Sequence, residues 1–182
     1  APGWLAAMAA ALDDADLVAG ALDVEALNPE WVRGTRGRSI AAGPGTFAGV
    51  VQFANSCNLG VRRSVVDRIG GVDESLRAGE DVEFSRRAAR AGIPVAYAAD
   101  AVVRYRYRIV LVALWRQAVA YGRSRRELEA RFRVEGVAIP ATPLARSWLG
   151  LVRRAPRAVI RKGRADLVFA AGNLWGRTWS GS

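Results

Sequence analysis

The chain has 182 residues, of which 51% are hydrophobic and 24% are charged, a composition typical of about one globular domain. It contains no histidine, which excludes serine and cysteine triads with an imidazole base and removes the commonest metal ligand. Cys57 is the only cysteine, so an intrachain disulfide and a Cys/His zinc site are excluded, a reducing compartment is expected, and acid-base chemistry falls to carboxylates.

The net charge of +10 is concentrated near the C-terminal end of the chain. Residues 142–182 contain eight basic residues and one acidic residue, a net charge of +7, so residues 1–141 carry only +3. An anionic partner is therefore expected for this tail. Tryptophans and aliphatic residues are interleaved with the arginines there, which favours an anionic membrane surface. Nucleic acid is not expected, because no recognisable nucleic-acid module accompanies the charge.

The N-terminal part of the chain predicts two regular elements followed by a long irregular stretch. Residues 4–12 are rich in strong helix formers, with Trp4 and Met8 on one face, and predict a helix. Residues 17–22 form an apolar run with the length of a buried strand. Glycines and prolines punctuate residues 23–47, which predicts an irregular excursion.

The rest of the chain predicts alternating strands and helices. Gly92 and Pro94 mark the end of one helix, because glycine is common just after a helix and proline cannot continue it. Gly122 makes a break in the longest helix an alternative to a continuous one. This alternation predicts an α/β layer architecture. The predicted elements are a strand or strand pair over 53–61, helices over 64–69 and 80–91, strands over 95–98 and 101–105, a helix over 111–132, and two weaker helices over 144–153 and 165–179.

A carboxylate at the start of one predicted helix is the first candidate for chemistry. Helical spacing places Asp81 above Phe84, so its carboxylate is expected to lean toward the apolar side of the helix. Glu83 and Arg87 are spaced for an ordinary surface ion pair on the other side. The alternative for Asp81 is that it complements the helix dipole, which is common and worth only about 0.3 to 1 kcal/mol.

Four blocks of sequence occur in an order that has a known counterpart. The blocks resemble the consecutive motifs of family 2 glycosyltransferases, and the resemblance covers roughly residues 1–135. It implies the C-terminal, acceptor-side part of a GT-A (Rossmann-like) glycosyltransferase domain over residues 1–135, followed by a basic helical tail over residues 136–182. The blocks are Asn-Ser-Cys-Asn-Leu-Gly-Val-Arg-Arg at 55–63, Ile-Gly-Gly-Val-Asp-Glu-Ser-Leu at 69–76, Gly-Glu-Asp at 79–81 and Asp-Ala-Val-Val at 100–103.

The resemblance implies transfer of a sugar, with inversion, from a nucleotide-sugar donor to an acceptor hydroxyl, as in hexosyltransferases that build cell-envelope polysaccharides. In that family the last acid of the block matched by 79–81 is the general base, which implies this role for Asp81. Glu80, Gly79 and Asn58 are implied on the acceptor side. For Asn58 the alternative is a buried amide whose hydrogen bonds are satisfied at a strand end.

Two arginines lie in the helix that follows the matched blocks. The resemblance implies that Arg123 and Arg125 approach the donor diphosphate, and the alternative is that they are exposed helical charges. Many relatives carry a histidine where this chain has arginines and tyrosines, within residues 102–107. A metal or diphosphate contact made there in relatives is therefore not carried over.

The resemblance places the family's Asp-x-Asp motif upstream of Ala1, just before the stretch matched by residues 2–5. A divalent metal, Mg²⁺ or Mn²⁺, is therefore expected for the complete enzyme, with no metal ligand assigned in this chain. The chain is expected to be a fragment that is inactive alone, and the partners of the complete protein are a nucleotide-sugar donor and a glycan or lipid-linked acceptor. The alternatives are a non-catalytic remnant and a basic module that docks on an anionic membrane or on nucleic acid.

The hydropathy pattern bears on location. No signal sequence opens the chain, and no apolar run approaches the roughly 18 residues needed to span a bilayer. The longest run, residues 109–115, ends at Arg116. A cytoplasmic location is expected, either free or peripheral on the inner face of the membrane.

Overall fold

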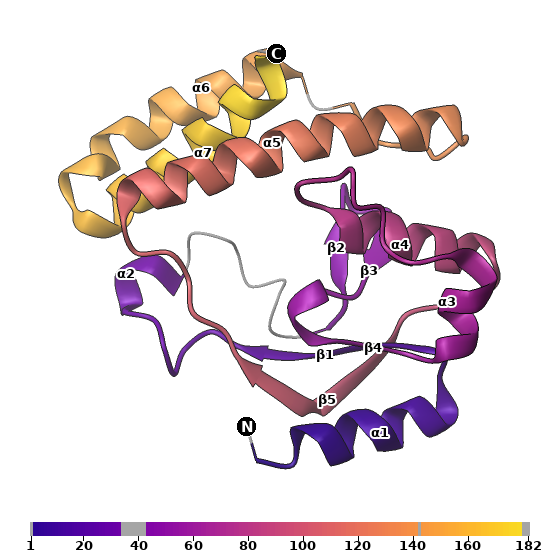
Figure 1. The fold of residues 1–182 in the computed structure, drawn as a ribbon. Helices are drawn as coiled ribbons and strands as arrows, with labels where there is room; N and C mark the ends of the chain where they lie inside the picture. The colour runs from indigo at the N-terminus through magenta and orange to yellow at the C-terminus, as the bar shows by residue number, and fades with distance from the viewer. Residues whose placement is uncertain (1, 34–42, 142, 180–182) are drawn as a thin grey trace. The chain divides into compact units, whose positions relative to one another are not determined.

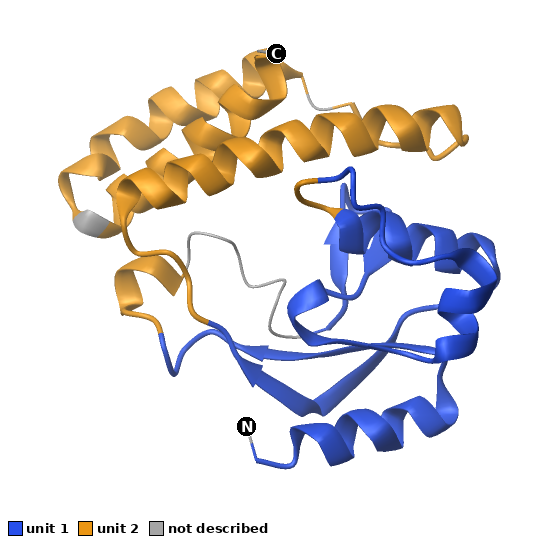
Figure 2. Ribbon diagram, in the orientation of Figure 1, with its two compact units in different colours: residues 1–27, 36–76, 80–105 blue, residues 28–35, 77–79, 106–182 orange. Residues whose placement is uncertain are grey.

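The computed structural model describes residues 2–33, 43–141 and 143–179, which form a mixed α/β fold. Contacts divide the chain into two compact units, coloured separately in Figure 2, and each is described by itself. The first unit comprises the described residues of 1–27, 36–76 and 80–105, and the second unit comprises those of 28–35, 77–79 and 106–182.

The first unit contains a three-stranded sheet, a separate two-stranded ladder and three α-helices among its described residues (Figure 1). The sheet has the order β4-β1-β5, with β1 antiparallel to β4 and parallel to β5. β2 and β3 pair with each other in antiparallel fashion. The elements are α1 (Trp4–Asp14), β1 (Leu17–Asp23), β2 (Gly45–Phe47), β3 (Val51–Phe53), the 3-10 turn η3 (Ser56–Asn58), β4 (Leu59–Val61), α3 (Arg63–Ile69), α4 (Glu80–Arg90) and β5 (Ala96–Arg104).

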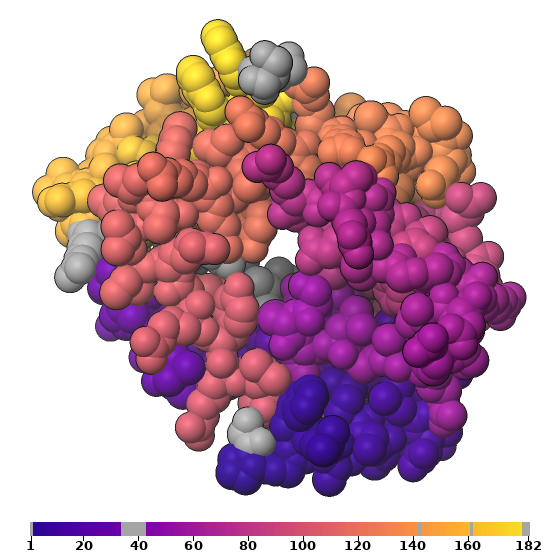
Figure 3. Space-filling model, viewed as in Figure 1, coloured from indigo at the N-terminus to yellow at the C-terminus, as the bar shows by residue number. Residues whose placement is uncertain are grey.

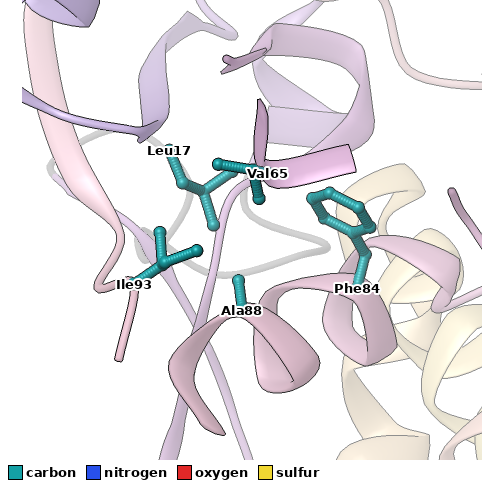
Figure 4. Close-up of a cluster of buried hydrophobic side chains, with 5 residues drawn as sticks. All are labelled: Leu17, Val65, Phe84, Ala88 and Ile93. Carbon is teal, nitrogen blue, oxygen red and sulfur yellow. The ribbon is translucent and has the colours of Figure 1, made fainter. Parts of the chain in front are cut away.

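The predicted buried strand is confirmed as β1, the centre of the sheet. Its residues are buried from Leu17 to Leu22, as expected for a strand with a neighbour on each edge and helices over both faces. Because successive side chains of a strand point to opposite faces, Leu17 packs with α3 and α4, whereas Val18 packs with α1. Figure 4 shows the cluster on the first of these faces, formed by Leu17, Val65, Phe84, Ala88 and Ile93.

The apolar stripe predicted for α4 is confirmed. Phe84 and Ala88 are 3% and 0% exposed, and Ala91 packs against the same cluster. The helix therefore presents this face to the sheet, and its orientation fixes the direction of the other side chains along it, including that of Asp81.

The two strands predicted between residues 95 and 105 are in fact one strand, β5. Its pairing with β1 shifts register, because Gly20 lies opposite Ala98 whereas the next residue, Ala21, lies opposite Val102. The extra residues of β5 leave the ladder at this point and form a bulge. The apparent interruption in the sequence pattern is therefore an irregularity within a single strand.

The described residues between 23 and 61 are only partly regular. An irregular stretch was expected over residues 23–47. Its described part includes α2 (Glu30–Arg33) and β2. Residues 34–42 lie outside the described residues. The strand or strand pair expected over 53–61 consists of the end of β3, then η3 and β4. β3 and β4 do not pair with each other, because β3 pairs with β2 and β4 pairs with β1.

The second unit is helical in its described part. The predicted helices over 144–153 and 165–179 are confirmed, although the last helix begins earlier, at Arg161. In the space-filling view, α5 and the C-terminal helices form a continuous surface that runs from salmon to yellow (Figure 3). The elements are α2, α5 (Leu111–Val134), α6 (Leu144–Arg154), the 3-10 turn η4 (Ala155–Val159) and α7 (Arg161–Thr178).

α5 continues through Gly122, so the alternative of a helix break is wrong. Gly122 instead allows α7 to approach closely, because a Cβ built there would lie 2.0 Å from the carbonyl oxygen of Asn173. A Cβ at Gly176 would lie 2.1 Å from the carbonyl oxygen of Val119. Glycine is needed at these positions because any side chain would collide with the backbone of the other helix.

We expect Gly122→Ala to lower the free energy of unfolding by about 1 to 3 kcal/mol, because the added methyl group overpacks the contact between α5 and α7. The same substitution at Gly150 is the matched control, because a Cβ there meets nothing within 4 Å. Gly150→Ala in α6 is expected to stabilise the chain by up to about 1 kcal/mol through helix propensity. Urea unfolding of both variants measures the difference, and a loss of the same size in both would contradict this role of Gly122.

Candidate active site

Asp81 lies in the first turn of α4, next to Glu80. Its Oδ2 accepts a hydrogen bond from the backbone N–H of Ser56 at 3.1 Å, and its Oδ1 accepts one from the N–H of Val82 at 2.9 Å. The residue is partly buried. The carboxylate is therefore fixed against the loop that leads into η3.

A second side chain of α4 holds the same loop. The Ser85 hydroxyl is fully buried and accepts a hydrogen bond from the N–H of Ala54 at 3.2 Å. Helix residues four apart are separated by about 6 Å along the axis, and residues two apart in an extended segment by about 6.6 Å. The distance between Asp81 and Ser85 along the helix therefore matches the distance between Ser56 and Ala54 along the loop. The two side chains together fix the loop along the helix.

The environment of Asp81 changes its proton affinity. Burial raises the pKa of its carboxyl group above the usual range, and the charge of neighbouring Glu80 raises that pKa further. The hydrogen bonds from the N–H groups of Ser56 and Val82 act in the opposite direction and lower the pKa. Because burial is the largest of these effects, Asp81 binds a proton more readily than an ordinary exposed aspartate.

Asn58 is 2% exposed, and its amide is hydrogen-bonded on both sides. Its Nδ2 donates to the carbonyl oxygens of Ala21 at 2.8 Å and Ala101 at 2.7 Å. Its Oδ1 accepts a hydrogen bond from the indole Nε1–H of Trp4 at 2.7 Å. One side chain therefore joins η3 to β1, β5 and α1.

These contacts explain how the bulge between β1 and β5 is stabilised. Ala21 and Ala101 lie where the ladder is irregular, and the Asn58 amide satisfies their carbonyl groups there. Gly20 leaves the necessary room, because a Cβ built on it would lie 2.3 Å from Asn58 Nδ2. Both amide hydrogens of Asn58 are used inside the protein, which favours the structural alternative over a contact with an acceptor.

The remaining acceptor-side predictions lie around the start of α4. Gly79 has a φ of 80°, a conformation that favours glycine. A Cβ at Gly79 would also lie 2.6 Å from Ser124 Oγ and 2.7 Å from Leu128 Cδ1. Glu80 begins the helix and is partly buried. Gly79 is thus required by the backbone, and the acceptor-binding roles of Gly79 and Glu80 stay predictions.

The two arginines predicted near the diphosphate lie on α5, in the second unit. Arg125 Nε donates to Glu129 Oε1 at 2.8 Å, so part of its guanidinium group is already used within the helix. Arg123 is exposed. Their proximity to a donor diphosphate stays a prediction.

Sequence reasoning missed a structural role of Arg87. The predicted pair with Glu83 is present at 2.6 Å, but the side chains of Arg87 and Glu83 are only 28% and 14% exposed, so it is not an ordinary surface pair. Arg87 also donates to the carbonyl oxygens of Ile69 and Gly71 and so holds the turn that follows α3. The Gly-Gly pair in that turn was the available signal, because such a turn leaves carbonyl groups in need of donors.

Among the described residues, no group of three or more His, Cys, Asp or Glu side chains is arranged to hold a metal ion. No helix in the described ranges is long and apolar enough to cross a membrane. No protein-family model, curated protein or solved structure matches the chain.

Proposed function

We propose that this chain is the acceptor-side part of an inverting glycosyltransferase of the GT-A type, with Asp81 as the general base. The observation that carries the proposal is the state of the Asp81 carboxylate, which is held by the Ser56 N–H and whose pKa is raised by burial. Carboxyl groups whose pKa is shifted by burial are concentrated at functional sites. The order of the four sequence blocks gives this carboxylate its proposed reaction class.

The proposed chemistry is a single displacement. Asp81 takes the proton of an acceptor hydroxyl while that oxygen attacks the anomeric carbon, and the nucleoside diphosphate leaves from the opposite face, which inverts the anomeric configuration. Each carboxylate oxygen has two acceptor positions, so Oδ2 can keep its bond to Ser56 while the group receives a proton. A raised pKa brings the base closer to neutral pH, where proton transfer is most effective.

The metal expected for the complete enzyme enters no step assigned to this chain. Its expected chemistry is stabilisation of the leaving diphosphate, and the resemblance places its ligands upstream. The roles assigned here are limited to the proton acceptor Asp81 and the groups that position it, the Ser56 N–H and the first turn of α4.

The first test is transfer of sugar by the protein together with the upstream part in which the resemblance places the Asp-x-Asp motif. A panel of nucleotide-sugar donors is incubated with glycan and lipid-linked acceptors, and the anomeric configuration of any product is determined by NMR. The proposal predicts a product whose configuration is opposite to that of the donor. A product with retained configuration would contradict the single displacement, and the absence of any transfer would contradict the enzyme itself.

A feature of α6 favours attachment of this enzyme to an anionic membrane. None of its residues is buried, and Leu144, Trp148 and Val152 lie four residues apart on one exposed face. Arg153 and Arg154 stand in its last turn. An exposed apolar face flanked by arginines matches the interface of an anionic bilayer, where apolar side chains enter and basic side chains meet lipid phosphates.

We expect Val152→Ser to weaken binding to vesicles containing phosphatidylserine by about threefold to tenfold, because one fewer apolar side chain is buried. Val134→Ser is the matched control, since Val134 on α5 is 90% exposed and Val152 is 68% exposed. Co-sedimentation measures both variants and the salt dependence, because binding to anionic lipid is screened by salt. Equal binding to neutral and anionic vesicles, or equal effects of the two substitutions, would exclude this mode of attachment.

A further inference from the structure

A cavity of about 720 Å³ lies within the second unit, lined by residues of α5, α6, η4 and α7. Its volume falls within the range of small-molecule binding sites, which is about 300 to 1,000 Å³. The lining is strongly basic, and Asp166 is the one acidic residue among the described residues that line it. The arginines that line it are Arg125, Arg146, Arg154, Arg157 and Arg177.

Carboxylates near the cavity do not balance the positive charge of its lining. Glu129 is 7% exposed and lies 2.8 Å from Arg125 Nε and 4.0 Å from Arg177 Nη2, so it compensates part of the charge on one side. On the other side, Arg146 and Arg157 form no ion pair with any residue that the structure describes. Asp166 and Glu129 together offer two carboxyl groups against the five lining arginines, so at least three of these arginines have no carboxylate counterpart of their own.

The carboxyl group of Asp166 leaves hydrogen-bond donors of the neighbouring arginines without an acceptor. Its Oδ1 is buried and has no hydrogen-bond partner in the described part of the chain. Burial raises the pKa of its carboxyl group, although the charges of Lys162 and Arg154 lower that pKa. The guanidinium group of Arg154 forms no hydrogen bond or ion pair with any described residue, so its donors are open to another acceptor.

The excess of positive charge in the lining favours a ligand with more than one negative charge. A single carboxylate brings one negative charge, whereas a phosphate monoester brings about two and a diphosphate up to about three. Arginine donates through a planar fork that matches phosphate oxygens two at a time. Several arginines around one concave space also concentrate their field there and attract multiply charged anions.

We propose that this cavity binds a multiply charged phosphate group, a phosphate monoester or a diphosphate, carried by a soluble molecule or by a lipid headgroup. Arg146, Arg154 and Arg157 hold the phosphate oxygens, and Asp166 sets the limit of the site on the side of α7. This site is lined entirely by the second unit and does not include Asp81. It shares only Arg125 with the residues expected near the donor diphosphate, and the residues proposed to hold the phosphate oxygens have no role in the proposed transfer reaction.

The test is calorimetric titration of the whole 182-residue chain with pyrophosphate at physiological salt. Arg154→Gln is expected to weaken binding by about 5- to 30-fold, because it removes charge-assisted hydrogen bonds in a partly exposed site. Arg153→Gln is the matched control: it makes the same change one residue earlier on α6, outside the cavity lining. It is expected to change affinity by less than about twofold, since exposed charges beyond contact are screened.

Two further variants distinguish binding in the cavity from misfolding of the variants and from non-specific attraction of pyrophosphate to the basic surface. Arg157→Gln is expected to weaken binding as Arg154→Gln does, and thermal melts of both variants should match that of the unchanged chain. Asp166→Asn is expected to tighten binding by roughly threefold or more, because a negative charge beside the anion is removed. Equal losses in Arg153→Gln and Arg154→Gln, or the absence of an effect of Asp166→Asn, would overturn the site in favour of general charge attraction.

Vesicles distinguish the two sources of the phosphate. One set contains phosphatidic acid, which exposes a phosphate monoester, and a second set contains phosphatidylserine at the same surface potential. Preference for the first set that is lost in Arg154→Gln identifies a lipid headgroup, whereas tight binding of free pyrophosphate with no such preference identifies a soluble ligand. Failure to bind pyrophosphate, together with equal binding to both vesicle types, would overturn the proposal.

Discussion

Replacing Asp81 with asparagine is expected to lower kcat for sugar transfer by about 10²- to 10⁴-fold, the usual contribution of a general base. Asparagine has nearly the same volume, and its one amide oxygen can still accept the hydrogen bond from the Ser56 N–H, whereas its NH2 group cannot accept the bond that Oδ1 receives from the Val82 N–H. It cannot accept a proton from an acceptor hydroxyl. The KM for the donor is expected to stay close to that of the unchanged enzyme, because the lost interaction arises only in the transition state.

The pH dependence of the stability of Asp81→Asn is a second test of this carboxyl group. Because burial raises the pKa of Asp81, the folded state binds the proton more tightly than the unfolded state. The contribution of this group to stability is therefore fully present below the pKa of the unfolded state and is lost as pH rises through the raised pKa of the folded state. Asp81→Asn should abolish this pH-dependent loss, so its Tm should fall less than that of the unchanged chain as pH rises through the raised pKa.

Glu80→Gln is the matched control for the reaction. Glu80 is the neighbouring carboxylate in the first turn of α4, so the substitution removes a charge at nearly the same place. Its effect on kcat should be smaller than that of Asp81→Asn if Glu80 only positions the acceptor. A Glu80→Gln enzyme that loses as much activity as Asp81→Asn would move the proton transfer to Glu80 or to the pair.

Asn58→Leu is expected to destabilise the fold by about 3 to 5 kcal/mol, because two buried hydrogen bonds and one partly buried hydrogen bond are lost, and each abandoned group costs about 1 to 3 kcal/mol when it is buried. The carbonyl groups of Ala21 and Ala101 would lose their donor at the bulge, and the Trp4 indole N–H would lose its acceptor. Leucine also cannot replace the amide geometry beside Gly20. Chemical unfolding measures the change directly.

Asn55→Leu is the control for that measurement. Asn55 precedes η3 in the same loop, and its side chain forms no hydrogen bond with any other described residue. The loss there should stay within about 0.5 kcal/mol, as for most surface substitutions. Trp4→Phe, which removes a single donor, should fall between the two. If Asn58→Leu costs no more than Asn55→Leu, the amide does not stabilise the bulge.

Most of the fold of this chain follows from local sequence signals. The buried strand at Leu17 and the helix at Asp81 were predictable, because each rests on apolar periodicity and on the residues that end helices. The continuity of β5 and of α5 was not predictable from those signals. In each case a tertiary contact decides the outcome: Asn58 satisfies a bulge in β5, and Gly122 meets the backbone of α7 within a continuous helix.

The candidate site was predictable only in part. The position of Asp81 follows from its place in a helix, but its hydrogen bond to Ser56 joins residues far apart in the sequence. The role of Asn58 could not be decided from its type, because a buried amide and a ligand-binding amide look alike until their partners are known. The paired spacing of Gly172 and Gly176 was a readable signal for close helix packing that sequence reasoning did not use.

The pH dependence of kcat/KM for sugar transfer, measured for the complete protein and for Asp81→Asn, tests the central claim most directly. Activity requires the ionised base, so the unchanged enzyme should lose activity as pH falls through one ionisation, with an apparent pKa above that of an ordinary aspartate. In Asp81→Asn this acidic limb should be absent from the residual activity. An Asp81→Asn enzyme that keeps both the wild-type rate and the same acidic limb would show that Asp81 is not the base.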